Sequence, residues 1–173
     1  MKFDGNVDGD ELMPRYLVEL APLHSELILI IGAMVLLLWG AFRPETERQA
    51  DIISWAAIGV LALAGIVLAR QPLGNNTLFD GSFRFDAFAR YVKMIVIISS
   101  AGALLLAPND ARRGKYLKFE YAVLLLLATA GMLMMISAND LISLYLSLEL
   151  QSLALYVLAA FKRDDVRSSE AGL

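Results

Sequence analysis

The sequence contains no cysteine and only one histidine among its 173 residues. Without cysteine, the chain can hold neither a disulfide nor an iron–sulfur cluster bound by thiolates. The single His24 also excludes a bis-histidine haem site and a histidine-rich metal site within this sequence. Lysine and arginine do not form a basic cluster with interleaved aromatic residues, so the sequence gives no support for nucleic-acid binding.

Apolar residues, by contrast, are abundant and arranged in long blocks. They make up 58% of the chain, whose mean hydropathy is +0.59, whereas about half is usual for a soluble domain. Each block contains about 20 residues, the length at which an α-helix crosses a bilayer core. The sequence therefore predicts an all-α fold, a polytopic transmembrane helix bundle.

Five blocks are expected to be transmembrane helices, at residues 23–42, 52–69, 87–107, 119–137 and 141–161. We expect Asp51 to cap the second and Asp86 the third, Pro108 to close the third, and Asn139 or Asp140 to cap the fifth. The short turn before the fifth block makes the last two blocks an antiparallel hairpin.

The remaining segments are polar. Residues 1–21 are interpreted as an N-terminal extension, because they lack the basic start and apolar core of a signal peptide. Residues 70–86 are rich in Gly, Asn and Pro and are expected to form a surface loop. The transmembrane bundle is thus predicted to occupy residues 22–173.

The positive charges favour one orientation in the membrane. With the N-terminus outside, the inner segments carry nine, namely Arg43, Arg48, Arg112, Arg113, Lys115, Lys118, Lys162, Arg163 and Arg167. The outer segments carry four, namely Lys2, Arg15, Arg70 and Arg84. Because cytoplasmic segments are enriched in Lys and Arg, we expect an outside N-terminus. Arg90 and Lys93, in the outer part of the third block, are expected to snorkel outward.

Glu149 is the main candidate functional residue, because it lies near the middle of the fifth block. At 1.5 Å per residue it lies about 12 Å from the outer end of that helix. A charge at such depth costs about 2.5–3.5 kcal/mol on insertion scales, and ionisable groups there are commonly functional. Burial favours the neutral carboxyl group and a nearby cation the ionised one, so a moving partner could drive proton exchange.

Two polar faces flank this carboxylate. Tyr145, Ser152 and Tyr156 share its helical face at −4, +3 and +7 and are candidate supporting residues. Ser143, Ser147 and Gln151 form a stripe on roughly the opposite face, where helix–helix packing is the simpler explanation. Since lipid offers neither face a polar partner, this helix is expected to lie in the interior of the protein.

Other polar residues have simpler explanations. Glu26 and His24 lie at the outer start of the first block, where interfacial water would solvate them. No cation lies deep enough in the five blocks to be an evident partner for Glu149. We therefore expect that partner to lie beyond Leu173.

Three motifs resemble a known family. They are the S-A-N-D-L turn at 137–141, L-Y-L-S-L-E-L-Q-S-L at 144–153 and the S-S-E-A-G-L that follows a basic stretch at 168–173. On these motifs the chain resembles the antiporter-like N subunit of bacterial respiratory complex I, NADH:quinone oxidoreductase. Residues 24–42 and 83–93 are also similar to the first and third helices of that subunit. The resemblance covers residues 22–173.

The resemblance implies a part of a larger subunit of about fourteen transmembrane helices. It implies proton translocation coupled to electron transfer from NADH to quinone, with Glu149 paired to a lysine on a later helix. The complex uses NADH, FMN, iron–sulfur clusters and quinone in other subunits, so no cofactor and no redox chemistry are expected in this chain. The partners implied are the other membrane-arm subunits and the lipid of the bacterial inner membrane.

Three alternatives stay open at this point. The M and L subunits, multisubunit cation/proton antiporters and membrane-bound hydrogenases share a helix with such a glutamate. A structural or assembly subunit would contain the same helices without transporting an ion. A receptor-like bundle is disfavoured, because no ligand-binding loop or domain is visible in the sequence.

Overall fold

The computed structural model describes residues 21–42, 47–71, 76–114 and 119–160. Within these ranges a short 3-10 turn, η1 (Ala21–Leu23), leads into five helices: α2 (His24–Ala41), α3 (Glu47–Arg70), α4 (Ala87–Gly114), α5 (Phe119–Ser137) and α6 (Leu141–Ala159). All five are long and apolar enough to cross a membrane. The predicted all-α transmembrane bundle is therefore confirmed, while residues 1–20 of the predicted N-terminal extension lie outside the described residues.

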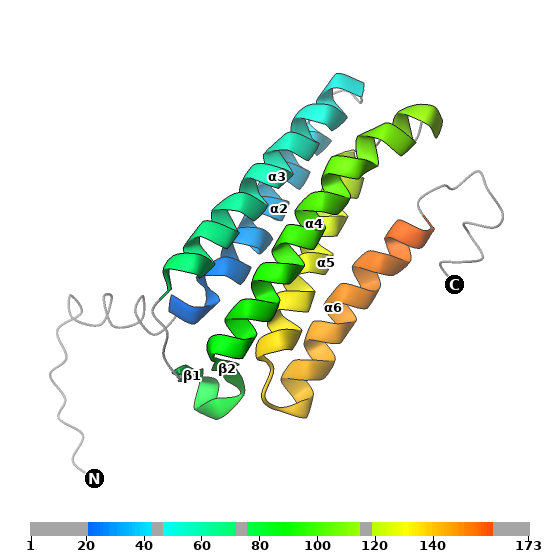
Figure 1. The fold of residues 1–173 in the computed structure, drawn as a ribbon. Helices are drawn as coiled ribbons and strands as arrows, with labels where there is room; N and C mark the ends of the chain where they lie inside the picture. The colour runs from blue at the N-terminus through cyan, green and yellow to red at the C-terminus, as the bar shows by residue number, and fades with distance from the viewer. Residues whose placement is uncertain (1–20, 43–46, 72–75, 115–118, 161–173) are drawn as a thin grey trace, which may run out of the picture.

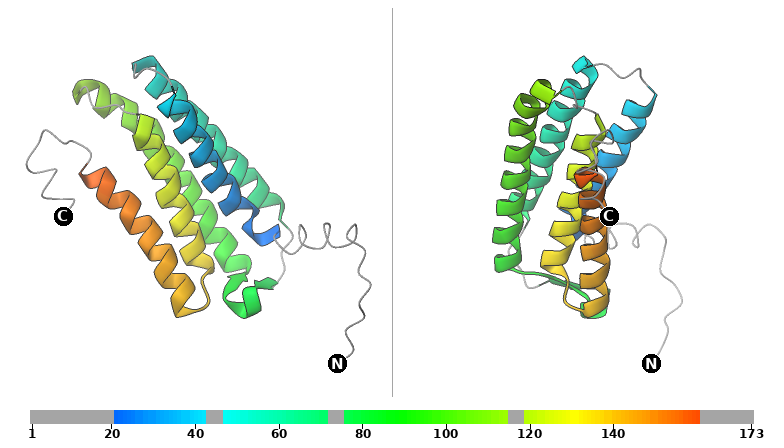
Figure 2. Two further views of the ribbon diagram at one scale, coloured as in Figure 1. Left: turned by 180° about the vertical axis from the view of Figure 1, so that it is seen from behind. Right: turned by 90° about the vertical axis from the view of Figure 1, so that its right-hand side faces the viewer.

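Helix α5 forms the centre of the bundle. It packs against α2, α3, α4 and α6, and Figures 1 and 2 show α6 beside it at one edge of the bundle, with α2 and α3 on the other side. Half of its membrane-length segment, 50%, is buried inside the protein, against 11% for α6. The core accordingly consists of apolar side chains from the first four helices, among them Leu29, Leu61, Leu104 and Leu126.

Two helices are longer than the sequence predicted. Helix α3 begins at Glu47, so Asp51 lies inside its first two turns and the expectation that it caps the helix was wrong. Helix α4 continues past Pro108 to Gly114, so that proline does not close it. A proline removes a single helical hydrogen bond and can be accommodated by a bend.

The other two caps are confirmed. The Ala89 amide donates to Asp86 Oδ1 over 2.8 Å, which places Asp86 as the N-cap of α4. The Ser143 amide donates to Asp140 Oδ1 over 2.6 Å, so Asp140 rather than Asn139 caps α6. Each carboxylate satisfies an amide that the first helical turn leaves without a partner.

The segment between α3 and α4 is more ordered than the expected surface loop. It contains an antiparallel hairpin of β1 (Asn76–Leu78) and β2 (Phe83–Phe85), joined by η2 (Phe79–Gly81). Gly81 has a φ of +94°, a conformation that glycine adopts without a steric penalty. Phe83 and Phe85 are buried against the helices whereas Arg84 between them is exposed, which gives β2 the alternation of a half-buried strand. We call this unit, residues 76–85, the hairpin.

Side chains also satisfy carbonyls at helix ends. The Gln49 side chain donates to the Gly40 carbonyl near the end of α2 over 3.0 Å. The Arg90 guanidinium donates to the carbonyls of Ala69 and Gln71 at the end of α3. Arg90 therefore contacts the C-terminus of a neighbouring helix, where a positive charge interacts favourably with the helix dipole.

Helices α5 and α6 approach closely at Gly131. A Cβ atom built on this glycine would lie 2.8 Å from the Gln151 amide nitrogen and 3.1 Å from its Cα. Ser147 and Ala154 on the same face of α6 are buried in the contact. Small residues at such crossings let two helix backbones come together, which is the main source of packing energy between helices in lipid.

We expect Gly131→Ala to destabilise the α5–α6 pair, because the added methyl group meets backbone that cannot rotate away. Overpacking of this kind costs about 1–3 kcal/mol. The measurement is the thermal unfolding midpoint of the protein purified in detergent. Gly59→Ala is the matched control, because a Cβ there meets nothing within 4 Å, and equal midpoints for the two variants would contradict the prediction.

The α6 cap predicts a pH dependence. The Ser82 hydroxyl, followed by the amide and hydroxyl of Ser143, donates to Asp140, and these hydrogen bonds hold the pKa of this carboxyl below its ordinary value. A depressed folded-state pKa contributes stability above the unfolded value of about 3.9, and this contribution is lost as pH falls through the folded pKa.

Asp140→Ala is therefore expected to lower the unfolding temperature at neutral pH, and the difference from the native protein should shrink as the pH falls below about 4. Thermal unfolding in detergent across this pH range measures the effect. Asp140→Asn, which keeps a capping oxygen but does not ionise, serves as control and should show a smaller loss. A difference that stays constant down to about pH 2 would refute the assignment.

Candidate functional site

Glu149 is the ninth residue of α6, and its side chain is half-buried. The Tyr145 side chain, one turn earlier, lies beside its carboxylate. The structure therefore brings these two predicted residues together, as their i, i+4 spacing requires. A phenol group at this place can donate a hydrogen bond to the carboxylate or hold a water beside it.

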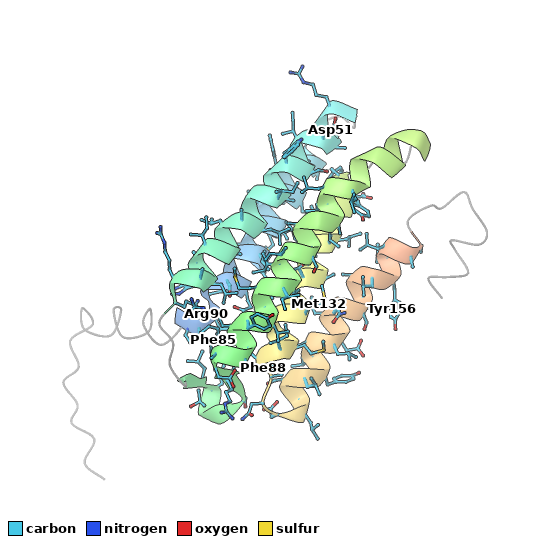
Figure 3. All side chains as sticks on the ribbon, in the orientation of Figure 1. Asp51, Phe85, Phe88, Arg90, Met132 and Tyr156 are labelled. Carbon is cyan, nitrogen blue, oxygen red and sulfur yellow. The ribbon has the colours of Figure 1, made fainter. Side chains whose placement is uncertain are left out.

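The two other candidates lie farther along the same helix. Ser152 is half-buried and Tyr156 is 56% exposed, and Figure 3 shows Tyr156 on the edge helix α6. Among the described residues no hydrogen bond joins either side chain to Glu149. The structure thus places all four candidates on α6, and of the other three Tyr145 lies beside Glu149.

The opposite stripe of α6 faces α5. Ser147 is buried, and its hydroxyl donates to the Ser143 carbonyl over 2.7 Å, while the Gln151 backbone meets Gly131 of α5. These residues therefore serve in helix–helix packing, the simpler of the two explanations. Packing on one face leaves the Glu149 face uncovered by the described helices.

The position of α6 differs from the expectation of an interior helix. Its membrane segment is the least buried of the five, and large apolar side chains such as Leu146, Leu153 and Val157 are more than half exposed. Within the described residues α6 packs chiefly against α5. A helix at the edge of a bundle buries only the stripe that meets its neighbour, whatever the polarity of its other face.

A second ionisable site, which the sequence did not reveal, lies between α2 and α4. Lys93 Nζ and Glu26 Oε1 are 2.5 Å apart, and their side chains are 0% and 1% exposed. The second carboxylate oxygen of Glu26 accepts a hydrogen bond of 2.8 Å from the Ser25 hydroxyl. Both charges are thus paired inside the protein, which membrane burial demands.

Two aromatic rings of the hairpin complete this site. The Lys93 ammonium lies 5.0 Å from the ring centroid of Phe83 and 5.2 Å from that of Phe85. Cations within about 6 Å of an aromatic face are attracted by its electron density, most strongly when water is excluded. The Lys93 ammonium is therefore held by a carboxylate from α2 and by β2 of the hairpin (Figure 3 labels Phe85).

The expected roles of Lys93 and Glu26 were wrong. Lys93 does not snorkel outward, and Glu26 is not solvated at an interface, because each is buried against the other. The available signal was the position of two opposite charges inside different spans near the same end of the bundle. Intramembrane charges tend to pair with one another, so this coincidence could have predicted the contact.

A third polar contact joins α4 and α5. The Thr129 hydroxyl lies 2.8 Å from the Ser100 hydroxyl and donates to the Leu125 carbonyl over 2.7 Å. Both side chains are buried. Their hydroxyls satisfy each other across the helix interface, and this contact carries no net charge. In the described part of the chain, no three His, Asp or Glu side chains gather as metal ligands would.

The comparisons with known proteins agree with these features. A family described as NADH:quinone oxidoreductase/Mrp antiporter, transmembrane, matches residues 138–173, which include α6. The chain is 52% identical over 155 residues to NADH-quinone oxidoreductase subunit N of Methylobacterium nodulans, covering 89% of this chain and 32% of that protein. It is 51% identical over 148 residues to NADH-quinone oxidoreductase subunit N 1 of Rhizobium meliloti, covering 86% and 30%.

A third relative, subunit N of Parvibaculum lavamentivorans, is 44% identical over 155 residues, covering 90% of this chain and 32% of that protein. The chain thus spans about a third of the length of the curated relatives that it matches. The resemblance to the N subunit is confirmed over this length. The names of these relatives favour the N subunit over the paralogous antiporter and hydrogenase subunits.

Proposed function

We propose that this chain acts in proton translocation as part of a membrane-arm subunit of NADH-quinone oxidoreductase, coupled to electron transfer from NADH to quinone. The observation that carries the proposal is one carboxylate, Glu149, inside a membrane-length helix that belongs to the segment matched by the NADH:quinone oxidoreductase/Mrp antiporter family. The names of the similar proteins supply the reaction of the whole complex.

Glu149 has the properties of a proton carrier. It lies about 12 Å along α6 from Leu141, well inside a helix of membrane length. Its face is not packed against α5, so the carboxylate is open to further protein, water or a cation. Tyr145 lies beside it, one turn earlier, and its phenol can donate a hydrogen bond.

The proposed mechanism depends on a lysine partner, which the resemblance to the N subunit places on a later helix. When the lysine approaches, the ionised carboxylate is stabilised, and when it withdraws, the neutral form is favoured. The two groups titrate as one coupled system, so a change in their distance moves a proton. Electron transfer elsewhere in the complex would drive that change of distance.

This chain would contribute no redox chemistry. It has no cysteine to ligate an iron–sulfur cluster. The NADH, FMN, iron–sulfur and quinone sites belong, in this proposal, to other subunits. Its partners are the other membrane-arm subunits and the lipids of the bacterial inner membrane, and its N-terminus faces outward.

The structural alternative makes a different prediction about Glu149. If the helices serve only as a scaffold, replacing the carboxylate changes assembly or stability and leaves transport per assembled complex unchanged. The Glu149 face is not used for packing within the described residues, whereas the Ser147 face is. This division favours a role for Glu149 beyond packing.

We expect Glu149→Gln in the complete subunit to reduce proton pumping by about tenfold or more, because the amide cannot exchange a proton. The measurement is the pH gradient formed by the assembled complex in vesicles when NADH is added. Glu120→Gln, at the start of α5, is the matched control and should pump normally. Undiminished pumping by a normally assembled Glu149→Gln complex would refute the proposal.

The proposed orientation can be tested with single cysteines, because the chain has none of its own. Thr77 on the hairpin and Arg48 at the start of α3 are both exposed and lie at opposite ends of the bundle. With the N-terminus outside, a membrane-impermeant maleimide should label Thr77→Cys in cells whose inner membrane is intact. Arg48→Cys should react only after that membrane is permeabilised, and the reverse pattern would invert the topology.

A further inference from the structure

The buried pair of Glu26 and Lys93 is not used by the proposed function. It lies between α2 and α4, whereas Glu149 lies on α6. Burying two charges carries a large desolvation cost, and replacing such a pair with apolar residues is often neutral or stabilising. A buried ion pair is therefore weak evidence for a role in stability alone, and its contacts indicate another role.

The first of these contacts joins the pair to the hairpin. The rings of Phe83 and Phe85 are buried and lie over the Lys93 ammonium. Glu26 holds that ammonium from the other side at 2.5 Å. The cation is thus fixed between helix α2 and strand β2, and β2 is held against the bundle.

The second set of contacts joins the hairpin to the α5–α6 turn. Phe83 and Ala138 form an antiparallel β-bridge. The Asn139 amide donates to the Ser82 carbonyl over 2.9 Å, and its side chain donates to the Gly81 carbonyl over 2.7 Å. The next residue, Asp140, accepts a hydrogen bond from the Ser82 side chain. Three consecutive residues, Ala138, Asn139 and Asp140, therefore link the turn to the hairpin.

The α5–α6 turn sets the position of Glu149. Helix α6 begins at Leu141, directly after these contacts, and continues without a break through Glu149. Its side packs chiefly against α5, across a contact of small residues. The hairpin is thus a second anchor for α6, at the end from which the depth and rotation of the helix are fixed.

We propose that Glu26 and Lys93 are positioning residues for Glu149: they hold the hairpin against the bundle, and the hairpin holds the α5–α6 turn. This inference rests on the proposed function only in so far as Glu149 is the proton site. The position of α6 itself can be measured without any transport assay. The two ideas can therefore fail separately.

The test uses the complete subunit in the assembled complex, in membrane vesicles. Glu26→Gln combined with Lys93→Met removes both charges at similar volume, so that no unpaired charge is left in the membrane. The readout is the initial rate at which a hydrophobic carbodiimide modifies Glu149, measured by mass spectrometry. We expect this rate to rise about threefold or more, because an unanchored turn lets α6 move away from the later helix that the proposed function places beside Glu149.

Two further variants separate positioning from general loosening. Asn139→Ala breaks the side-chain link to Gly81 and should raise the same rate. Adding it to Glu26→Gln with Lys93→Met should give no further rise, because both changes release the same attachment of the α5–α6 turn to the hairpin. Ser100→Ala with Thr129→Val breaks a buried polar contact between α4 and α5 far from the hairpin and should leave the rate unchanged. Additive effects, or an equal rise in this control, would overturn the inference.

If the complex with Glu26→Gln and Lys93→Met does not assemble, a variant that keeps the ion pair still tests the inference. Phe83→Leu removes one ring over Lys93 and leaves Glu26 in place, and it should give an intermediate rise in the rate. An unchanged rate in an assembled Phe83→Leu complex overturns the inference. If Glu149→Gln pumps normally while these variants still alter Glu149 labelling, the proposed function fails and the positioning role stands.

Discussion

A charge in the hydrocarbon core of a membrane must find its partner inside the protein, and this constraint explains most of the structure. Lys93 and Glu26 form an ion pair, Ser25 donates a hydrogen bond to Glu26, and two phenylalanine rings contact the Lys93 ammonium. Ser147 and Thr129 meet the weaker demand of a hydroxyl by donating to carbonyls of their own helices. The backbone meets it by forming helices throughout the membrane-length segments.

Glu149 takes no part in these contacts. It lies beside Tyr145, and its face of α6 is not packed against α5. The contrast with Glu26 is instructive, since the same side chain is sealed and ion-paired at one site and open at the other. A sealed pair suits a fixed mechanical contact, whereas an open carboxylate suits exchange of a proton or of a partner.

The sequence predicted the positions of the helices along the chain well, because membrane length and apolar composition are properties of single segments. It predicted the caps at Asp86 and Asp140 for the same reason, since a capping carboxylate acts within one turn of its own residue. It was less successful at Asp51 and Pro108, where a helix continued through a residue that often ends one. It also missed the hairpin, because strands of three residues leave almost no periodic signal.

By itself, the sequence determined the number and type of the helices, the candidate carboxylate on the fifth, and a resemblance that the relatives confirm. Only the tertiary structure decided that Lys93 and Glu26 are partners, that the Ser147 face of α6 meets α5, and that the hairpin is bonded to the α5–α6 turn. The physical reason is the separation along the chain over which each interaction acts. Burial in lipid and helix formation act within a segment, whereas an ion pair between residues 67 positions apart depends on which helices pack together.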